Sequence, residues 1–322
     1  MKKRALVTGI TGQTASYMCE LLLEKGYDVF GLVRRQSNET LDNIAHILDK
    51  ITLIHGDLTD SSSLIEALEI SNPEEIYNFA AQSHVHVSWQ QPILTSEIDA
   101  IGPLKLLEAV RKYNPKIKIV QASSSEQFGR VLEVPQTEKT AFNPVSPYAV
   151  SKCFAFSMMR TYRFSYNMFA VNAISFNHES PRRGVEFVTR KITLGVAKIK
   201  LGLANKISLG NLDSQRDWSH AKDIVKGVYA IMQHNEPDDF VLCSGETHSI
   251  KEFLTEAFNV IGISDWTPYV EIDPKFIRPA EVNLLLGDHT KATTILGWEP
   301  TITVKELVKE MVEQDIKNIT CK

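Results

Sequence analysis

The sequence predicts an α/β fold, with a doubly wound parallel sheet and a smaller C-terminal α/β lobe. Short apolar strands alternate with helical spans through the first half of the chain, which is typical of a parallel sheet covered by helices on both faces. A glycine-bearing loop follows the first strand, and after about residue 172 the alternation gives way to loops and shorter elements. The 322 residues, 43% of them hydrophobic, are more than one core usually holds, so two lobes are expected.

The first half of the chain supplies five strands. Residues 4–7 form the first strand, and residues 15–25 form a helix that Gly26 ends. Further strands are expected at 29–33, 51–55, 75–79 and 117–122, and long helices at 103–113 and 148–166. This order assigns residues 1–172 to a dinucleotide-binding domain of Rossmann type.

The second lobe takes mainly residues 173–322. An apolar run at 240–243 is predicted to be a further strand that returns to the sheet, so a segment near 212–244 is expected to belong to the first domain. The two lobes are therefore not contiguous in the sequence.

Gly9, Gly12 and Ala15 form a GxxGxxA loop between the first strand and the first helix. Such a loop places backbone N–H groups and a helix N-terminus against a pyrophosphate, and alanine at the third position still permits close packing of the helix on the strand. The competing interpretation is an ordinary strand-to-helix turn. The place of this loop at the first strand of an alternating pattern favours a dinucleotide cofactor.

Arg34 and Arg35 end the second strand, where a chain that selects NAD usually has an acidic residue for the ribose hydroxyls. Two guanidinium groups suit a 2′-phosphate, so NADP is predicted; the alternative is a solvated surface pair. Asp28 does not favour NAD, since it lies at the start of that strand. Asp57 follows the third strand, where its carboxylate can accept a hydrogen bond from an adenine amino group or cap the next helix.

Tyr148 and Lys152 stand four residues apart, so on a helix they share one face. We expect the lysine ammonium to lower the pKa of the phenol, which makes Tyr148 a base for hydride transfer from a carbinol to a dinucleotide. Ser124 can hydrogen-bond the same hydroxyl. Glu126 adds a carboxylate that removes a carbon-bound proton, and oxidation followed by proton removal means dehydration. The alternatives are two solvent-facing helix residues for the Tyr-Lys pair, and a loop carboxylate or helix cap for Glu126.

Basic residues recur after an apolar run at 169–176, most of them close to turn-forming residues. The set comprises His178, Arg182, Arg183, Arg190, Lys191, Arg216 and Arg278, with the acidic Glu281 beside the last. Each alone is explained by a surface charge or a structural histidine, but a substrate that carries a pyrophosphate gives them a common purpose.

Composition argues against several other classes of protein. The net charge is −4 and the basic residues are dispersed, which argues against nucleic-acid binding. The four cysteines are far apart and lack metal-ligand spacing, so thiols in a reducing compartment and no metal site are expected. No apolar run is long enough to span a membrane, and the N-terminal run is too short for a signal peptide, so a cytoplasmic location is expected.

The chain resembles the extended short-chain dehydrogenase/reductase family, and within it the GDP-mannose 4,6-dehydratases. The resemblance covers nearly the whole chain, and its later segments are more specific than a glycine fingerprint. It is carried by TGITGQ (8–13), HGDLTDSSSL (55–64), AAQSHVHVS (80–88), SSSEQFG (123–129), SPYAVSK (146–152), FNHESPRRG (176–184), FVTRKI (187–192), LGNLDSQRDW (209–218) and RPAEVNLLLGD (278–288).

The resemblance implies roles for individual residues of these segments. Ser124, Glu126, Tyr148 and Lys152 would be catalytic. NADP would be bound by Thr8, Gly9, Thr11, Gly12, Gln13, Thr14, Asp57, Leu58, Ala80, Ala81, Gln82, Ser83, His178 and Arg183, besides Tyr148 and Lys152. The GDP-sugar would be bound by Asn177, Val188, Lys191, Arg216, Arg278 and Glu281, together with Ser83, Ser124 and Glu126.

Several positions depart from the family pattern. Ser124 replaces a threonine and keeps its hydroxyl, Leu94 replaces a cofactor-contacting tyrosine, and Thr14-Ala15 replaces Asp-Gly. The loop after Arg35 lacks the NTGR segment that reaches a neighbouring subunit's cofactor in tetrameric members. A homodimer is expected, in which helices 103–113 and 148–166 pair with their copies in a four-helix bundle as in the family, and a homotetramer is left open.

The implied reaction oxidises C4 of a GDP-hexose, eliminates water across C5–C6 and reduces C6, which gives a GDP-4-keto-6-deoxy sugar. GDP-mannose is the expected substrate, with GDP-heptose and GDP-N-acetylglucosamine as alternatives. A nucleotide-sugar 4-epimerase or 4-ketoreductase would use the same Tyr-Lys pair without a base for C5, and Glu126 argues against it. A non-catalytic dinucleotide-sensing protein is disfavoured by the intact Ser124, Tyr148 and Lys152.

Overall fold

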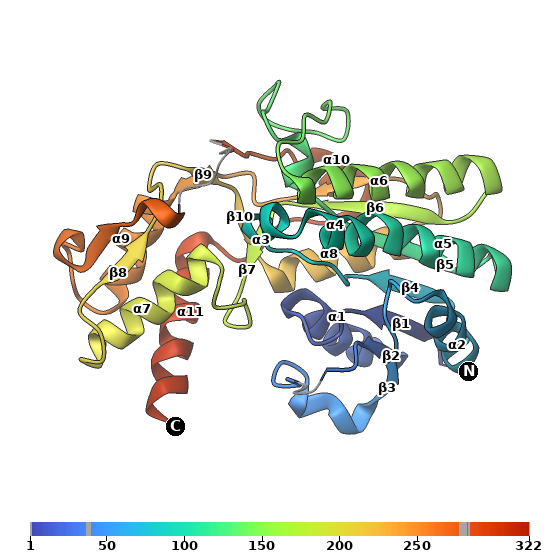
Figure 1. Cartoon of the computed structure of the whole chain (residues 1–322), viewed down its shortest axis with the longest axis horizontal. Coiled ribbons are helices and arrows are strands. Elements are labelled where there is room, and N and C mark those ends of the chain that lie inside the picture. The colour runs from blue at the N-terminus through green and yellow to red at the C-terminus, as the bar shows by residue number, and fades with distance from the viewer. Residues whose placement is uncertain (1, 37–39, 277–281, 283, 322) are drawn as a thin grey trace.

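The computed structural model describes residues 2–36, 40–276, 282 and 284–321 of the chain. Seven parallel strands form its central sheet, in the order β11-β6-β5-β4-β1-β2-β3 (Figure 1). The strands are β1 (Arg4–Thr8), β2 (Asp28–Val33), β3 (Ile51–His55), β4 (Glu75–Asn78), β5 (Lys118–Ser124), β6 (Ala170–Ser175) and β11 (Phe240–Leu242). The central strands are buried on both faces, and their middle residues are mainly apolar.

Helices cover both faces of the sheet (Figure 1). On one face lie α1 (Gln13–Glu24) and α8 (Ala221–Gln233), and on the other α2 (Ser61–Ser71), α5 (Gly102–Tyr113) and α6 (Pro147–Tyr166). Each face has its own apolar core, so the sheet is the middle layer of three.

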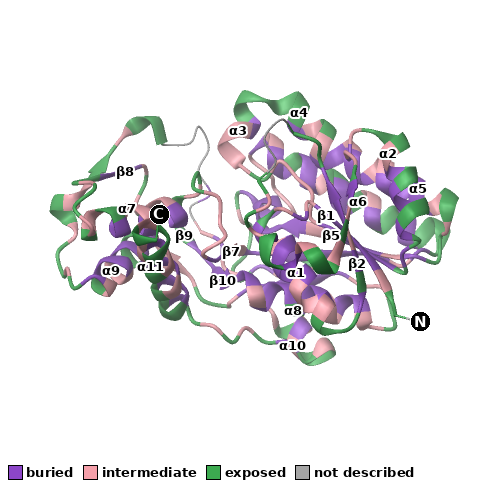
Figure 2. Ribbon diagram, turned by 90° about the horizontal axis from the view of Figure 1, so that it is seen from below, coloured by how far each residue is buried: buried purple, intermediate pink, exposed green. Residues whose placement is uncertain are grey.

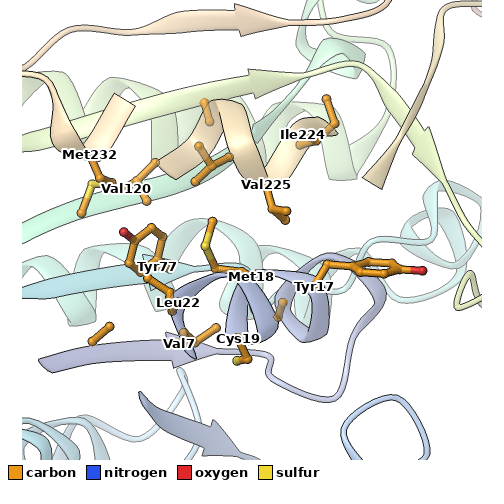
Figure 3. Packing of buried hydrophobic residues seen from close by; sticks show 14 of the residues in the cluster. Val7, Tyr17, Met18, Cys19, Leu22, Tyr77, Val120, Ile224, Val225 and Met232 are labelled. Atoms are coloured by element: carbon orange, nitrogen blue, oxygen red, sulfur yellow. The ribbon is translucent and has the colours of Figure 1, made fainter. Parts of the chain in front are cut away.

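Figure 3 shows how α1 is held between the sheet and α8. Met18 and Leu22 of α1 are fully buried between Val7 and Tyr77 of the sheet and Val225 of α8. Burial of an apolar side chain of this size contributes about 1.5–3 kcal/mol. This packing fixes α1 so that its first turn stands at the carboxyl end of β1.

The structure confirms the predicted strands with small shifts at their ends. β5 runs on to Ser124, two residues beyond the predicted 117–122, because Ser124 continues the parallel pairing opposite Ser175 of β6. α1 begins at Gln13, before the predicted residue 15, because Gly12 takes the extended backbone of an N-cap. The run at 240–243 forms β11, which pairs with β6 at the edge of the sheet, as predicted.

The second lobe is built on α7 (Val188–Lys200), α9 (Ile250–Val260) and α11 (Val304–Thr320), which enclose Trp218, Phe253 and Phe258. Three two-stranded sheets accompany them: β7 (Asn177–Glu179) with β10 (Trp218–His220), β8 (Ile207–Leu209) with β13 (Val270–Ile272), and β9 (Gln215–Arg216) with β12 (His248–Ser249). Figure 2 shows buried residues inside this lobe as well as around the sheet, so each lobe has its own core.

The remaining elements are short. They are η1 (Ala45–Lys50), α3 (Val85–Gln90), α4 (Pro92–Ser96), η2 (Glu97–Ile101), η3 (Ser125–Phe128), η4 (Thr267–Tyr269), η5 (Pro274–Phe276) and α10 (Thr290–Leu296). Of the helices in the part of the chain that the structure describes, none is both long and apolar enough to cross a membrane.

The strand order reverses between β1 and β4, since the chain runs outward to β3 on one side and then to β5, β6 and β11 on the other. Ligands of open α/β sheets bind outside the carboxyl ends of the strands at such a reversal. The glycine loop after β1 lies at this point, and the second lobe faces it.

Candidate active site

A cleft of about 1300 Å³ lies at the carboxyl ends of the strands. Its walls come from the loops after β1, β2, β3, β4 and β5, from α6, and from the second lobe. A cleft of this size accommodates a dinucleotide together with a second large ligand, because single drug-sized ligands occupy about 300–1000 Å³.

The glycine loop forms one wall of this cleft. Gly9 has φ +65°, and a Cβ on Gly9 would lie 2.8 Å from Cα of Ala80, so only glycine fits between the two loops. Gly12 caps α1 without a side-chain hydrogen bond, which leaves the N–H groups of the first turn for an anion. These features fit the pyrophosphate of a dinucleotide.

Thr8, which was expected among the cofactor residues, does not line the cleft. Its hydroxyl donates to Oδ1 of Asn78 over 2.6 Å and accepts from the N–H of Ala80 over 3.0 Å. Thr8 therefore supports the loop after β4 from behind. That loop lines the cleft with Ala80, Ala81, Gln82 and Ser83, and Leu58 and Leu94 line it nearby.

The first turn of α1 is joined to the second lobe. Nε2 of Gln13 donates to the carbonyl of His178 over 3.0 Å, and Oε1 of Gln13 accepts from Ser180 over 2.7 Å. Thr14 lies 2.8 Å from Nε2 of His178. Burial and the nearby Arg183 lower the pKa of His178 to about 4, so the ring is neutral near pH 7. Gln13, Thr14, Thr11 and His178 all line the cleft.

Arg34 and Arg35 follow β2 and are exposed. Arg34 lines the main cleft, and both arginines line an adjoining hollow of about 300 Å³ together with Gly56 and Asp57. Oδ1 of Asp57 accepts from the N–H and the hydroxyl of Thr59, both over 2.8 Å. The helix-cap interpretation of Asp57 is wrong, because Asp60 is the N-cap of α2. Asp57 lines the cleft instead.

Tyr148 and Lys152 lie on the first turns of α6, and Ser124 ends β5 beside them. Ser146 caps α6 by accepting from the N–H of Ala149 over 3.1 Å, and Pro147 occupies the first helical position, so the start of this helix is firmly set. All three side chains line the cleft.

The pKa of Tyr148 lies above its ordinary value, so the lowered pKa expected for this phenol is not found in the chain alone. Burial of the phenol has the largest effect, and the carboxylates of Asp99 and Glu126 raise the pKa further. A hydrogen bond with Ser124 and the charge of Arg183 act in the opposite direction but do not offset burial.

Lys152 is almost completely buried, and burial lowers the pKa of its ammonium. Its Nζ donates to the carbonyl of Ala122 over 3.0 Å and lies 5.7 Å from the centre of the Tyr148 ring. The ammonium is therefore held between β5 and α6, below the phenol ring.

Glu126 lies in η3, directly after β5, and lines the cleft although only 8% of it is exposed. The hydroxyl of Ser124 accepts from the N–H of Glu126 over 3.2 Å, and the side chain of Gln127 accepts from the N–H of Ser124 over 3.1 Å. This reciprocal cap ties Glu126 to the residue that hydrogen-bonds Tyr148. The backbone of Glu126 is thus held at the end of β5, and the residue lines the cleft.

The second lobe lines the far end of the cleft. Asn177, Val188, Lys191 and Arg216 all face it, as does Arg183, whose Nε lies 3.0 Å from Glu179. Nζ of Lys191 lies 3.2 Å from the ring centre of Phe276. Arg278 and Glu281 lie outside the described residues.

Two arginines expected to reach a pyrophosphate do not line the cleft. Arg182 pairs with Glu20 over 2.5 Å and covers the ring of Tyr17 at 4.0 Å, and Arg190 is paired with the buried Asp315. Both hold the second lobe together or against α1. Each stands next to an arginine or lysine that does line the cleft, and the sequence alone does not say which of two neighbours points inward.

Asp99 is a feature of the site that the sequence analysis missed. It is fully buried, lies close enough to Tyr148 and Lys152 to affect the pKa of both, and accepts from the N–H of Gln82 over 2.7 Å. The only signal in the sequence is an acidic residue within an otherwise apolar stretch, 98–101. Across the described ranges, no group of three or more His, Cys, Asp or Glu residues is arranged to hold a metal ion.

Residues 6–311 match the GDP-mannose 4,6 dehydratase family. The chain belongs to this family. "GDP-mannose 4,6 dehydratase 2" of Caenorhabditis elegans is 48% identical over 98% of this chain and 89% of its own length, and "GDP-mannose 4,6-dehydratase" of Vibrio cholerae is 45% identical over 98% and 95%.

Solved structures of the same architecture are similar to the chain over nearly its whole length. UDP-glucose 4-epimerase from Bifidobacterium longum, in complex with NAD+ and UDP, has a TM-score of 0.85 and 25% identity over 98% of both chains. Family membership and this likeness agree with the doubly wound parallel sheet predicted from the sequence.

Proposed function

We propose that the chain is a GDP-mannose 4,6-dehydratase, a lyase that converts GDP-mannose to its GDP-4-keto-6-deoxy sugar. The observation that carries the proposal is the position of Glu126, which lines the same cleft as Tyr148 and donates its backbone N–H to Ser124. Oxidation at C4 needs only a phenolic base and its hydrogen-bonding partner. Elimination of water needs a second acid-base group within the same cleft, and Glu126 is that group.

The coenzyme belongs to the nicotinamide dinucleotides, and we propose NADP. Gly9, Gly12 and the first turn of α1 would hold its pyrophosphate, and Arg34 and Arg35 would hold its 2′-phosphate. When bound, NADP supplies the acceptor for the C4 hydride and its donor to C6, and its cationic oxidised ring adds positive charge near Tyr148. The other proposed cofactor residues that line the cleft are Thr11, Gln13, Thr14, Asp57, Leu58, Ala80, Ala81, Gln82, Ser83, Lys152, His178 and Arg183.

Tyr148 takes the proton of the C4 hydroxyl, and Ser124 hydrogen-bonds the same oxygen. Lys152 keeps a positive charge 5.7 Å below the phenol ring, which favours the phenolate. Burial raises the pKa of Tyr148 in the chain alone, and the positive charge of the bound oxidised coenzyme would act in the opposite direction.

Glu126 acts on the next two bonds. A ketone at C4 acidifies the C5 proton, Glu126 removes that proton, and the same carboxyl group returns it to the hydroxide that leaves C6. C5 takes up a proton when C6 is reduced, which balances the proton that Tyr148 removed from the C4 hydroxyl, so one water leaves and the coenzyme ends as it began. The coenzyme therefore needs no external recycling.

The GDP portion is proposed to lie against the second lobe. Lys191 and Arg216 present positive charge to the diphosphate, and Asn177 and Val188 complete this end of the cleft. Residues 1–172, with a returning segment near 212–244, would thus form the coenzyme domain, and 173–322 mainly the sugar-nucleotide lobe.

Incubation of purified protein with GDP-mannose tests the proposal. The expected product is lighter by one water and carries a ketone at C4, which mass spectrometry and NMR detect. Parallel incubations with GDP-heptose and GDP-N-acetylglucosamine identify the sugar. A product that keeps the mass of its substrate would show a 4-epimerase, and no product from any of the three would refute the dehydratase.

A further inference from the structure

A fully buried acid stands behind the catalytic pair. Asp99 lies in η2, one turn of π-helix between α4 and α5, and is 0% exposed. π-turns are rare and are frequent at functional sites. η2 packs against α6, which carries both Tyr148 and Lys152.

The two carboxylate oxygens of Asp99 have different surroundings. Oδ1 accepts from the N–H of Gln82 over 2.7 Å, which anchors the cleft-lining loop after β4. Oδ2 is buried and has no hydrogen-bond partner in the described part of the chain. A buried carboxylate with so few hydrogen bonds needs a nearby cation to stay ionised.

Lys152 is that cation. Its charge lowers the pKa of Asp99, whereas burial raises it. Burial has the larger effect, so the pKa of Asp99 is raised to about 6. In return Asp99 raises the pKa of Lys152, while burial lowers it. The pair therefore shares one buried environment, and the charge of each supports the other.

The other ionisable groups around η2 do not take the place of Asp99 or Lys152 in this charge pair. Glu97, on the same turn, is exposed. On α5, Lys105 donates to the carbonyl of Thr59, and Glu108 pairs with Arg111. α4 carries no ionisable side chain. Around the phenol, Glu126 raises the pKa of Tyr148 and Arg183 lowers it, and Asp99 acts on it more strongly than either.

We propose that Asp99 is a positioning residue of the dehydratase, which keeps Lys152 in its cationic form and fixes the cleft-lining loop through Gln82. Only the kinetic test of this inference rests on the proposed function. Asp99 touches neither coenzyme nor substrate in this role, since it does not line the cleft. Its charge acts through Lys152 and Tyr148.

Asp99→Asn tests the charge while keeping an oxygen for the N–H of Gln82. Because Asp99 raises the pKa of both Tyr148 and Lys152, its removal should lower both. Both limbs of the pH profile of kcat/KM for GDP-mannose should therefore move to lower pH, by roughly one unit, the lower end of the range for a neighbouring charge. Below a pH of about 6, where Asp99 itself takes up a proton, wild type and variant should converge.

Glu97→Gln is the matched control, since it removes the same charge from an exposed position of the same turn. Its profile should coincide with that of the wild type. Asp99→Glu, which restores a carboxylate, should return both limbs toward wild-type pH even where kcat is reduced. Asp99→Ser replaces Asp99→Asn if the latter does not fold.

A second measurement on the ligand-free protein is independent of the proposed function. Trace acetylation with acetic anhydride modifies only neutral amines, so the pH midpoint for labelling of Lys152, read by peptide mass spectrometry, reports its pKa. The midpoint should fall in Asp99→Asn and stay in Glu97→Gln, with Lys105 as the internal reference. An unchanged Lys152 midpoint in folded Asp99→Asn overturns the inference, whereas a wild type that makes no keto sugar refutes only the function.

Discussion

Thr14 and His178, 164 positions apart in the chain, are joined by a hydrogen bond of 2.8 Å between the first turn of α1 and β7. Nδ1 of His178 lies 2.8 Å from the carbonyl of Phe176, which only accepts, so Nδ1 carries the proton. Nε2 of the neutral ring is then an acceptor, and the hydroxyl of Thr14 donates to it. With the ring neutral, this bond ties the coenzyme loop to the second lobe.

The stability of the protein should therefore depend on the protonation of His178. Its pKa of about 4 in the folded chain lies below the ordinary value of about 6.5 for histidine. This contribution of His178 is complete above the ordinary pKa and is lost as the pH falls through the folded pKa. The free energy of unfolding should therefore decline between the two pKa values, by an amount on the order of 3 kcal/mol. Denaturant unfolding at a series of pH values measures it.

His178→Asn keeps an N–H for the carbonyl of Phe176 but does not titrate, so its stability should change less with pH over the same range. His234→Asn, at the C-terminus of α8, is the matched control and should follow the wild type. Equal pH dependence in His178→Asn and wild type would rule out the ring as its source.

Much of the fold could be predicted because it depends on local patterns. Apolar runs bounded by turn residues located the parallel strands, and the run at 240–243 located the strand that returns to the sheet. The convergence of Ser124, Glu126 and Tyr148 also followed, since the carboxyl ends of parallel strands meet at one edge of the sheet.

The features that could not be predicted depend on how deeply a side chain is buried and on which way it points. Arg190 and Lys191 are neighbours on α7, and only the packing of α11 decides that the first pairs with Asp315 while the second faces the cleft. The raised pKa of Tyr148 depends on how deeply the phenol is buried. The role of Asp99 was not predicted because it depends on a π-turn, which has no recognisable sequence motif.

Replacement of Arg34 and Arg35 by alanine should weaken the binding of NADP more than that of NAD. Both guanidinium groups border the hollow beside the cleft, and only NADP has a 2′-phosphate for them to pair with. Loss of charge-assisted hydrogen bonds of about 1.5–3 kcal/mol corresponds to a loss in affinity of roughly 10- to 100-fold. Isothermal calorimetry with each coenzyme measures it.

Arg130→Ala is the control for this pair, because Arg130 is exposed and lies outside the cleft. It should leave both affinities unchanged. If the double variant loses NADP and NAD affinity equally, the arginines serve only as general positive charge and the coenzyme preference has another source.

A homodimer is predicted from an apolar stripe on α6. Val150, Phe154 and Phe164 are exposed at spacings of four and ten residues, which places them along one side of the helix, and they are 54%, 38% and 70% exposed. Val150→Asp with Phe154→Asp should shift the protein from dimer to monomer, because two carboxylates would be buried unpaired. Light scattering over a range of concentrations measures the mass.

Leu203→Asp tests whether any exposed apolar position has the same effect. Leu203 is 64% exposed and belongs to the second lobe, away from α6, so its variant should keep the wild-type mass. A wild type that is monomeric at every concentration would refute the dimer itself.

Glu126→Gln should separate oxidation from dehydration. The amide keeps the size of the side chain and leaves the N–H of Glu126 bonded to Ser124, so Tyr148 keeps its hydrogen-bonding partner and the C4 step should proceed. An amide cannot take the C5 proton, so release of the 4-keto-6-deoxy product should fall at least ~10²-fold, within the range for a positioned acid-base group. Reduced coenzyme should then accumulate as an absorbance burst on mixing with GDP-mannose, whereas the wild type should show little.

Glu133→Gln is the control, because Glu133 is a carboxylate of the following loop that lies outside the cleft, and this variant should behave like the wild type. Product release by Glu126→Gln at a rate near that of the wild type would mean that another group removes the C5 proton, and the proposed dehydration mechanism would be wrong.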